Sequence, residues 1–230
     1  MLTGVGREGQ VGEAVAERLG HDGFGLILVD RDAANVEARA AELRNRGVTA
    51  HAHVADLADP QSVTDLFGRI KGQHGNDLAA FVHLAGGFAA TGRVAETSVA
   101  DWDRQLSINL RTAFLVSREA IPMLRRHRGS VVYFSSESAL TGAKLSGIAA
   151  YGVAKSAVLS LAIAISQEEA EHGVRANILA PAAIRTASNT ASMPSTAKFV
   201  EREDVAAMVA WLCSDEARAV TGQVIRLTAH

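Results

Sequence analysis

The fold is decided by Thr3-Gly4-Val5-Gly6-Arg7-Glu8-Gly9-Gln10-Val11-Gly12, a glycine-rich stretch that a helical pattern follows over residues 13–19. Its glycines permit a tight bend and let backbone N–H groups approach a pyrophosphate at the helix N-terminus. An ordinary glycine-rich turn is the alternative interpretation, because this signal is weak when it stands alone.

Beyond this turn, short apolar runs alternate with longer amphipathic segments. Strands are predicted at residues 26–29, 50–54, 78–84, 130–134, 174–179 and 223–227, and helices at residues 33–46, 60–74, 101–127, 150–172 and 203–213. Alternation at this spacing is typical of a doubly wound parallel sheet. No linker or repeat interrupts it, so we expect a single α/β domain over residues 1–230.

The strand that should lead into the glycine turn is expected to be largely missing. Such a fold normally opens with a buried strand, yet only Met1 and Leu2 precede Thr3. A lost central strand would leave backbone groups of its neighbours unpaired. We therefore expect a native start several residues upstream, and an intact mass of the natively expressed protein that matches these 230 residues would contradict this expectation.

Composition excludes several classes of protein. The chain is 48% hydrophobic and 21% charged with a net charge of −2, which suits a globular core rather than a nucleic-acid partner. The basic run at 125–128 is more typical of a helix end. The single cysteine, Cys213, excludes an internal disulfide, and no metal site is predicted. The polar N-terminus and the short uncharged stretch 156–167 predict neither a signal peptide nor a membrane span, so a cytoplasmic protein is expected.

Asp30 strengthens the dinucleotide interpretation. It ends the strand predicted at 26–29, 18 residues after Gly12, where a carboxylate accepts hydrogen bonds from the adenosine ribose of NAD. The same carboxylate would repel the 2′-phosphate of NADP, whereas Arg7 and Arg31 would attract it. The sequence favours NAD over NADP, with a mere cap on the following helix as the alternative role of Asp30.

A second pattern, Tyr151-Gly152-Val153-Ala154-Lys155, lies at a predicted helix start. The i, i+4 spacing puts Tyr151 and Lys155 on one face. A nearby ammonium favours the phenolate, which would lower the pKa of Tyr151 toward that of a working acid or base. Alone, this pattern is most often a surface pair.

Taken together, these segments resemble the short-chain dehydrogenase/reductase family over essentially the whole chain, which implies a Rossmann-like fold. The matching segments are Thr3–Gly12, Asp56-Leu57, His83-Leu84-Ala85-Gly86, Trp102-Asp103 through Asn109-Leu110, Ser135-Ser136, Tyr151 with Lys155, Asn177 to Pro181, and Ser214-Asp215-Glu216 through Thr221-Gly222-Gln223. These motifs, in the right order, are specific together.

The resemblance implies a hydride transfer between a nicotinamide and a small secondary alcohol or ketone. The implied catalytic residues are Asn109, Ser136, Tyr151 and Lys155. The implied cofactor-binding residues are Gly4, Gly6, Gln10, Val11, Gly12, Asp30, Asp56, Leu57, Leu84, Ala85, Gly86, Tyr151, Lys155, Ile184 and Thr186. The cofactor supplies the hydride chemistry, and the protein supplies placement and proton transfer.

Each catalytic residue has an implied role. Tyr151 exchanges a proton with the substrate oxygen, and Lys155 holds the nicotinamide ribose. Ser136 fixes the substrate oxygen, and Asn109 holds a water that links Lys155 to solvent. Alternatively, Asn109 only fills a helix kink and Ser136 only satisfies a strand end. Ser138 competes with Ser136, because most relatives place the serine 13 residues before the tyrosine; we favour Ser136 with a two-residue insertion after it.

Several departures from the family pattern affect the cofactor site. The glycine turn is two residues longer than usual, with Gln10 in place of a glycine. This length matches the enoyl-reductase-like branch, but that branch separates its tyrosine and lysine by six residues rather than three, which argues against enoyl reduction. His83-Leu84 replaces two asparagines and is expected to remove polar ties between strands. Ala182 replaces a glycine near the nicotinamide.

The segment 185–200, where relatives place a lid, is short and polar here. It suggests a small substrate or an open site, or a mobile loop without a substrate role. Phe88, Met193 and Lys144 are candidate pocket residues. A pterin reductase of the dihydropteridine-reductase type, or a non-catalytic dinucleotide-binding protein on the same fold, are the alternative functions. Relatives assemble through the helices at 101–127 and 150–172, so a homotetramer or homodimer is expected.

Overall fold

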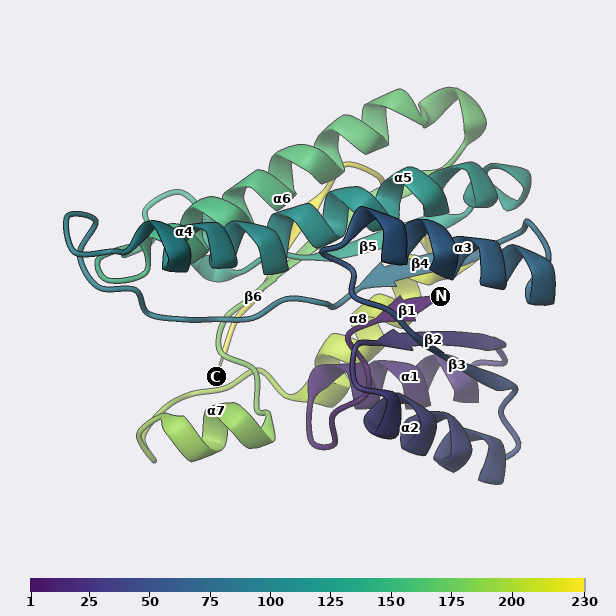
Figure 1. Cartoon of the computed structure of the whole chain (residues 1–230), viewed down its shortest axis with the longest axis horizontal. Helices are drawn as coiled ribbons and strands as arrows, with labels where there is room; N and C mark the ends of the chain where they lie inside the picture. Colours follow the sequence, from purple (N-terminus) through teal and green to yellow (C-terminus); the bar gives the residue numbers. More distant parts are fainter. Residues whose placement is uncertain (230) are drawn as a thin grey trace.

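A seven-stranded parallel sheet forms the centre of the computed structural model, which describes residues 1–229 (Figure 1). The strands are β1 (Leu2–Thr3), β2 (Leu26–Asp30), β3 (Ala50–Val54), β4 (Ala80–His83), β5 (Ser130–Phe134), β6 (Arg175–Pro181) and β7 (Val224–Leu227). Their order is β3-β2-β1-β4-β5-β6-β7, so the winding reverses between β1 and β4. Ligands of doubly wound folds bind beyond the carboxyl ends of the strands at this point. The predicted doubly wound α/β fold is confirmed.

Helices cover both faces of the sheet. Their bounds are α1 (Val11–His21), α2 (Ala33–Asn45), α3 (Pro60–His74), α4 (Val99–Leu106), α5 (Thr112–Leu124), α6 (Ala149–Glu168), α7 (Ala187–Ser192) and α8 (Arg202–Cys213). In Figure 1, α3, α5 and α6 lie on one side of the sheet, and α1, α2 and α8 lie on the other. Short polar residues start several of them: Asp32, Asp59 and Ser98 each accept a hydrogen bond from a backbone N–H in the first turn of α2, α3 and α4.

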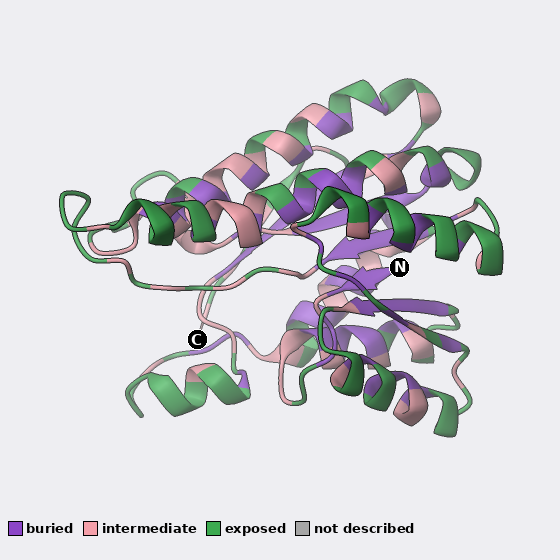
Figure 2. Ribbon diagram, viewed as in Figure 1, coloured by how far each residue is buried: buried purple, intermediate pink, exposed green. Residues whose placement is uncertain are grey.

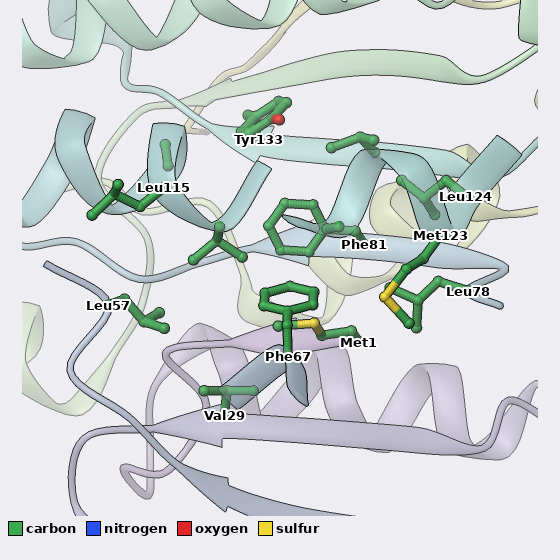
Figure 3. Packing of buried hydrophobic residues seen from close by; sticks show 14 of the residues in the cluster. Met1, Val29, Leu57, Phe67, Leu78, Phe81, Leu115, Met123, Leu124 and Tyr133 are labelled. Carbon is green, nitrogen blue, oxygen red and sulfur yellow. The ribbon is translucent and has the colours of Figure 1, made fainter. Parts of the chain in front are cut away.

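Two apolar clusters pack against the two faces, and the inner strands β1, β2, β4, β5 and β6 between them are mostly buried (Figure 2). On the α3–α5–α6 side, Phe67, Phe81 and Tyr133 are fully buried, and the rings of Phe81 and Tyr133 meet edge to face with centroids 6.2 Å apart (Figure 3). On the α1–α2–α8 side, the cluster is built from aliphatic residues such as Leu19, Val15 and Val209. Burial on both faces explains why inner strands such as β2 read as apolar runs.

The first strand is present but short. Leu2 and Thr3 pair in parallel with Leu28 and Val29 of β2 on one side and with β4 on the other. The main chain of Met1 adds two hydrogen bonds to β4: its amino group donates to the carbonyl of Ala80, and its carbonyl accepts from the amide of Val82. Two residues therefore link the two halves of the sheet where β2 contributes five.

The predicted single helix over 101–127 is wrong in one respect. The structure divides it into α4, a π-helical turn at Ser107–Arg111, and α5. Within this stretch the hydroxyl of Thr112 donates to the carbonyl of Ile108, and the side chain of Asn109 turns inward. Single π-helical turns inside α-helices are frequent at functional sites.

Helix α6 is long and apolar enough to cross a bilayer by length and composition alone, with a mean hydropathy of 1.5. In the structure it lies along the sheet, and its residues Val158, Ala162 and Ile165 are buried in the core. Its apolar character is therefore that of a core helix that also carries exposed apolar residues, Val153 and Ile163.

Candidate active site

The glycine turn lies at the carboxyl end of β1, against the loop that follows β4. Gly4 adopts a φ of +74°, and a Cβ atom there would come within 2.7 Å of the backbone nitrogen of Ala85. A Cβ atom on Gly12 would come within 2.7 Å of the Cα of Val5, so α1 starts directly against the turn. Both positions require glycine, and the close packing brings the N-terminus of α1 to the switch point of the sheet.

Asp30 holds the turn from the end of β2. Its carboxylate accepts one hydrogen bond from the amide of Gly6 at 3.0 Å and one from the amide of Asp32 at 3.2 Å. The alternative role as a cap of α2 falls instead to Asp32, which accepts from the amide of Asn35. Carboxylate oxygens have further lone pairs, so Asp30 can bind hydroxyl donors while it holds the turn.

The glycine turn is also held by a network of charged residues that lie far apart in the sequence. The sequence analysis did not identify this network. Glu13 accepts from the amide of Gly9 at 2.8 Å, from Arg39 at 2.5 Å and from Arg202 at 3.0 Å. Burial raises the pKa of Glu13, but these donors outweigh it and hold that pKa below its ordinary value. Arg39 is buried and also pairs with Glu42. The only sequence signal was an acidic residue in the first turn of a helix.

Lys155 occupies the opposite side of the switch point, on α6. Its ammonium donates to the carbonyl of Phe134 at 2.9 Å, and its own carbonyl accepts from the hydroxyl of Ser135 at 2.8 Å. The end of β5 thus grips Lys155 at both its backbone and its side chain. Burial lowers the pKa of Lys155 to about 8, because a charged amine is disfavoured away from water.

Tyr151 lies one turn before Lys155, with its ring edge to face against Phe88 at a centroid distance of 5.1 Å. Burial raises its pKa, and a hydrogen bond with Ser136 opposes that rise. The predicted lowering of the pKa by Lys155 is wrong for this structure. The ammonium lies 5.9 Å from the centroid of the Tyr151 ring and is directed at the carbonyl of Phe134.

Of the two competing serines, Ser136 is the one whose hydrogen bond opposes the raised pKa of Tyr151. Ser136 directly follows Ser135 at the end of β5, and its hydroxyl oxygen accepts from the amide of Ser138 at 3.2 Å and from the hydroxyl of Ser138 at 2.9 Å. Ser138 therefore contacts Ser136, and the choice of Ser136 as the substrate serine stays a prediction.

Asn109 sits in the π-helical turn, and its side chain is directed at the loop after β4. Its carbonyl oxygen accepts from the amide of Gly87 at 3.1 Å, and its amino group donates to the carbonyls of Gly87 and Gln105. A Cβ atom on Gly86 would come within 2.7 Å of Asn109 Oδ1 and 3.3 Å of Lys155 Nζ. The side chain therefore fills the kink, and the water-holding role stays a prediction.

His83 corrects the expectation that His83-Leu84 removes polar ties between strands. The hydroxyl of Thr112 donates to Ile108, so it accepts from Nε2–H of His83 at 3.3 Å, which leaves Nδ1 to accept from the hydroxyl of Thr3 at 3.0 Å. Burial, with a smaller contribution from the charge of Lys155, lowers the pKa of His83 to about 3. A neutral imidazole thus ties β4 to β1 and α5.

The remaining expected cofactor residues lie in the loops that follow β1, β3, β4 and β6. Leu84, Ala85 and Gly86 follow β4 beside the glycine turn, and Val11 opens α1. Asp56 lies in the loop after β3 with its carboxylate bonded to the amide of Ala58, whereas Leu57 is buried in the core (Figure 3). Ile184 pairs with Val200, and Thr186 caps α7.

The segment that follows β6 is fastened to the glycine turn. The amide of Ala187 donates to the carbonyl of Gly9 at 2.9 Å, and the hydroxyl of Ser188 donates to the side-chain oxygen of Gln10 at 3.0 Å. Gln10 thus uses its side chain to bind α7, although the residue replaces an expected glycine. Helix α7 and the glycine turn form a latch, defined here as Gly9 and Gln10 with Ala187 and Ser188.

The fold and this arrangement define a dinucleotide-binding α/β domain with a tyrosine, a lysine and a serine gathered at the switch point of its sheet. The family model described as Enoyl-(Acyl carrier protein) reductase matches residues 4–228. The chain belongs to the short-chain dehydrogenase/reductase family of oxidoreductases.

Relatives of known name agree with this assignment. Meso-2,3-butanediol dehydrogenase of Serratia marcescens is 32% identical, with 96% of this chain and 89% of that protein covered. The 2-(S)-hydroxypropyl-CoM dehydrogenase 3 of Xanthobacter autotrophicus is 30% identical, with 96% and 91% covered. A solved short-chain type dehydrogenase/reductase from Mycobacterium ulcerans superposes with a TM-score of 0.87 at 30% identity, over 99% of this chain and 86% of that chain.

Proposed function

We propose that this protein is an NAD(P)-dependent dehydrogenase/reductase that interconverts a small secondary alcohol and its ketone. The observation that carries the proposal is the meeting of Ser136, Tyr151 and the buried Lys155 beside the glycine turn. The three residues between Tyr151 and Lys155 favour alcohol–ketone chemistry over enoyl reduction. Two relatives named for a hydroxypropyl and a butanediol substrate support a small secondary alcohol.

The residues present fit a dinucleotide cofactor. The glycine turn places backbone N–H groups at the start of α1, and Asp30 offers a fixed carboxylate to ribose hydroxyls. Gly4, Gly6, Gln10, Val11 and Gly12 would hold the pyrophosphate side, and Lys155, Ile184 and Thr186 the nicotinamide side. When bound, the nicotinamide donates or accepts the hydride. We propose NAD as the preferred cofactor, because the Asp30 carboxylate would repel a 2′-phosphate.

The chain's own residues then handle the proton. The half-buried phenol of Tyr151 has a raised pKa, so it remains protonated at neutral pH and can donate its proton to the oxygen of a ketone. In the reverse direction it must first lose that proton, and the Ser136 hydroxyl stabilises the phenolate by a hydrogen bond. Ser136 also fixes the substrate oxygen beside Tyr151.

The surroundings of Tyr151 support a small, partly apolar substrate. Phe88 stands against the phenol ring and is 65% exposed, so its apolar surface is open on the other side. Helix α7, which follows β6 at the site, has only six residues. We propose that Phe88 forms one wall of the substrate pocket.

We propose further that the protein is a soluble cytoplasmic homodimer or homotetramer built on α5 and α6. Phe114 on α5 and Val153 on α6 are large apolar side chains that are 47% and 43% exposed. A hollow of about 880 Å³ is lined by Phe114 together with Leu110 and Leu161, with Asp56, Asp59, Asp103 and Arg111 among its polar residues. A second copy would cover these apolar surfaces, and a light-scattering mass of one subunit at micromolar concentration would contradict the proposal.

The function is tested in two steps, binding first. Thermal unfolding with NADH and with NADPH should show a larger stabilisation by NADH, since binding at 100 times Kd stabilises a fold by about 2.7 kcal/mol. Small ketones should then oxidise NADH with the purified protein, and Tyr151→Phe should abolish turnover while the NADH-dependent stabilisation remains. Binding without turnover on ketones, alcohols or a dihydropterin would contradict the oxidoreductase proposal. Turnover on the dihydropterin alone would contradict the choice of substrate.

A further inference from the structure

A short 3₁₀ turn, Glu137–Ala139, follows β5 and brings Ser138 back onto Ser136. The amide of Ser138 donates to Ser136 Oγ at 3.2 Å, and the hydroxyl of Ser138 donates to the same oxygen at 2.9 Å. Both donors belong to Ser138, so the Ser136 oxygen is hydrogen-bonded on the side that faces the Glu137–Ala139 turn. Neither the fold nor the proposed reaction requires a hydroxyl at position 138.

The hydrogen of the Ser136 hydroxyl has few remaining directions. A serine hydroxyl carries one hydrogen and two acceptor lone pairs. Ser138 fills the acceptor positions, so the hydrogen is left to point away from the turn. Ser136 is also the side chain whose hydrogen bond opposes the raised pKa of Tyr151. With Ser138 as the donor to Ser136, the Ser136 hydrogen is the one left to be offered to Tyr151 or to a substrate oxygen.

We propose that Ser138 is a positioning residue that aims the Ser136 hydroxyl at Tyr151 and at the substrate oxygen. This inference rests on the proposed function, in which Ser136 and Tyr151 act on that oxygen. A hydroxyl that accepts a hydrogen bond becomes a stronger donor, because successive bonds polarise one another. Without the Ser138 hydroxyl, Ser136 is held only by the Ser138 amide, and its hydrogen is free to rotate into the turn.

The charged groups near the hydroxyls of Ser138, Ser136 and Tyr151 each have other hydrogen-bond or ionic partners. Lys155 on α6 donates to the carbonyl of Phe134, and His83 on β4 remains neutral between Thr3 and Thr112. Glu137, between the two serines, is paired with Arg226 on β7. A change at Ser138 should therefore reach the titration of Tyr151 through Ser136.

The test compares three variants with the unmodified enzyme and with Ser136→Ala, using NADH with a small ketone and NAD with the matching alcohol. Ser138→Ala removes the hydroxyl and keeps the amide, Ser138→Thr keeps the hydroxyl, and Ser146→Ala is a control at an exposed serine of the same loop. We expect Ser138→Ala to lower kcat about threefold to tenfold with an unchanged KM for the cofactor. The apparent pKa of alcohol oxidation should rise, because the phenolate loses support. Ser138→Thr and Ser146→Ala should retain the profile of the unmodified enzyme.

Two results would overturn the inference. One is a pH profile of Ser138→Ala that coincides with that of the unmodified enzyme, which would leave Ser138 with a structural role only. The other is a near-complete loss of turnover in Ser138→Ala while Ser136→Ala remains active, which would make Ser138 the serine that contacts substrate. Stabilisation by NADH in each variant confirms folding. Failure of the proposed function itself would appear separately, as turnover that survives Tyr151→Phe.

Discussion

The two sides of the switch point are held in different ways. On the catalytic side, Lys155 and Asn109 are bonded mostly to main-chain carbonyls and amides at the ends of β5 and β4. On the cofactor side, the glycine turn is held by carboxylates, Asp30 at Gly6 and Glu13 at Gly9, and Glu13 is in turn gripped by Arg39 and Arg202. The main-chain partners orient the side chains of Lys155 and Asn109. The ion pairs of Glu13 instead join α1 to α2 and α8.

This difference implies a division of labour. The catalytic side buries an amine at a cost in stability, so its changes should separate activity from stability. The cofactor side binds its loop through ion pairs that also join three helices, so its changes should lower stability and cofactor affinity together. The latch, which joins the turn to α7 through one carbonyl and one side-chain amide, should affect only the exchange of cofactor.

The largest effect is expected for Lys155→Met. Turnover should fall by about 10³-fold, because the ribose contact and the nearby cation are both lost. At pH 7 the variant should nevertheless be more stable than the unmodified protein by about 2 kcal/mol, since it no longer buries a charge. Urea unfolding with an activity assay measures both quantities.

The stability difference between the unmodified protein and Lys155→Met should depend on pH in a definite direction. The folded pKa of Lys155, about 8, lies below the ordinary value of 10.5, so the unfolded chain binds more protons between these two values. The unmodified protein should therefore gain stability relative to Lys155→Met as the pH rises from 8 to 10.5. A variant that is less stable at pH 7 and runs parallel to the unmodified protein up to pH 10 would refute the buried-charge explanation.

A smaller, combined effect is expected for Glu13→Gln. The neutral amide weakens the contact with Arg39, whose side chain is 3% exposed and retains only Glu42 as an ionic partner. The free energy of unfolding should fall by about 2 kcal/mol. The Kd for NADH should rise several-fold, because a neutral amide oxygen holds the Gly9 amide less firmly than the carboxylate does. Chemical unfolding and a fluorescence titration measure the two changes.

Glu17→Gln is the matched control on the same helix. Glu17 pairs with Arg46 on the surface, where side-chain exposures are 37% and 56%, and its loss should change stability by less than about 0.5 kcal/mol. If Glu13→Gln behaves like Glu17→Gln, the charged network does not hold the glycine turn, and the contrast between the two sides fails.

The sequence predicts well those features that depend on local pattern. Strands and helices followed from alternating apolar runs, and the meeting of Ser136, Tyr151 and Lys155 followed from motif spacing and resemblance. A helix kink at Asn109 was one of the sequence alternatives, but the sequence did not show that the kink is a π-helical turn at Ser107–Arg111 in which Asn109 contacts the distant Gly87. Helical periodicity alone does not distinguish a regular helix from one with an extra residue in a turn.

The groups that hold the site were also hidden from the sequence, for the same physical reason. Arg39 and Arg202 lie far from Glu13 along the chain and have the ordinary look of helix-surface charges. His83 was expected to lose polar ties, yet an imidazole offers one donor and one acceptor, which suits two threonine hydroxyls as well as asparagine does. Such pairings appear only when the fold brings the strands together.

The smallest effect is expected at the latch, for Ser188→Ala. This change removes the hydrogen bond to Gln10 and leaves the backbone bond from Ala187 to Gly9 in place. Stability should change by less than about 0.5 kcal/mol, while NADH should dissociate about twofold to threefold faster in stopped-flow displacement. Ser192→Ala is the control, because its hydroxyl bonds only within α7. Equal dissociation rates in both variants would mean that the latch does not retain the cofactor. Faster release in Ser188→Ala alone, without a loss of stability, would separate cofactor exchange from the charged network that binds the other side of the same turn.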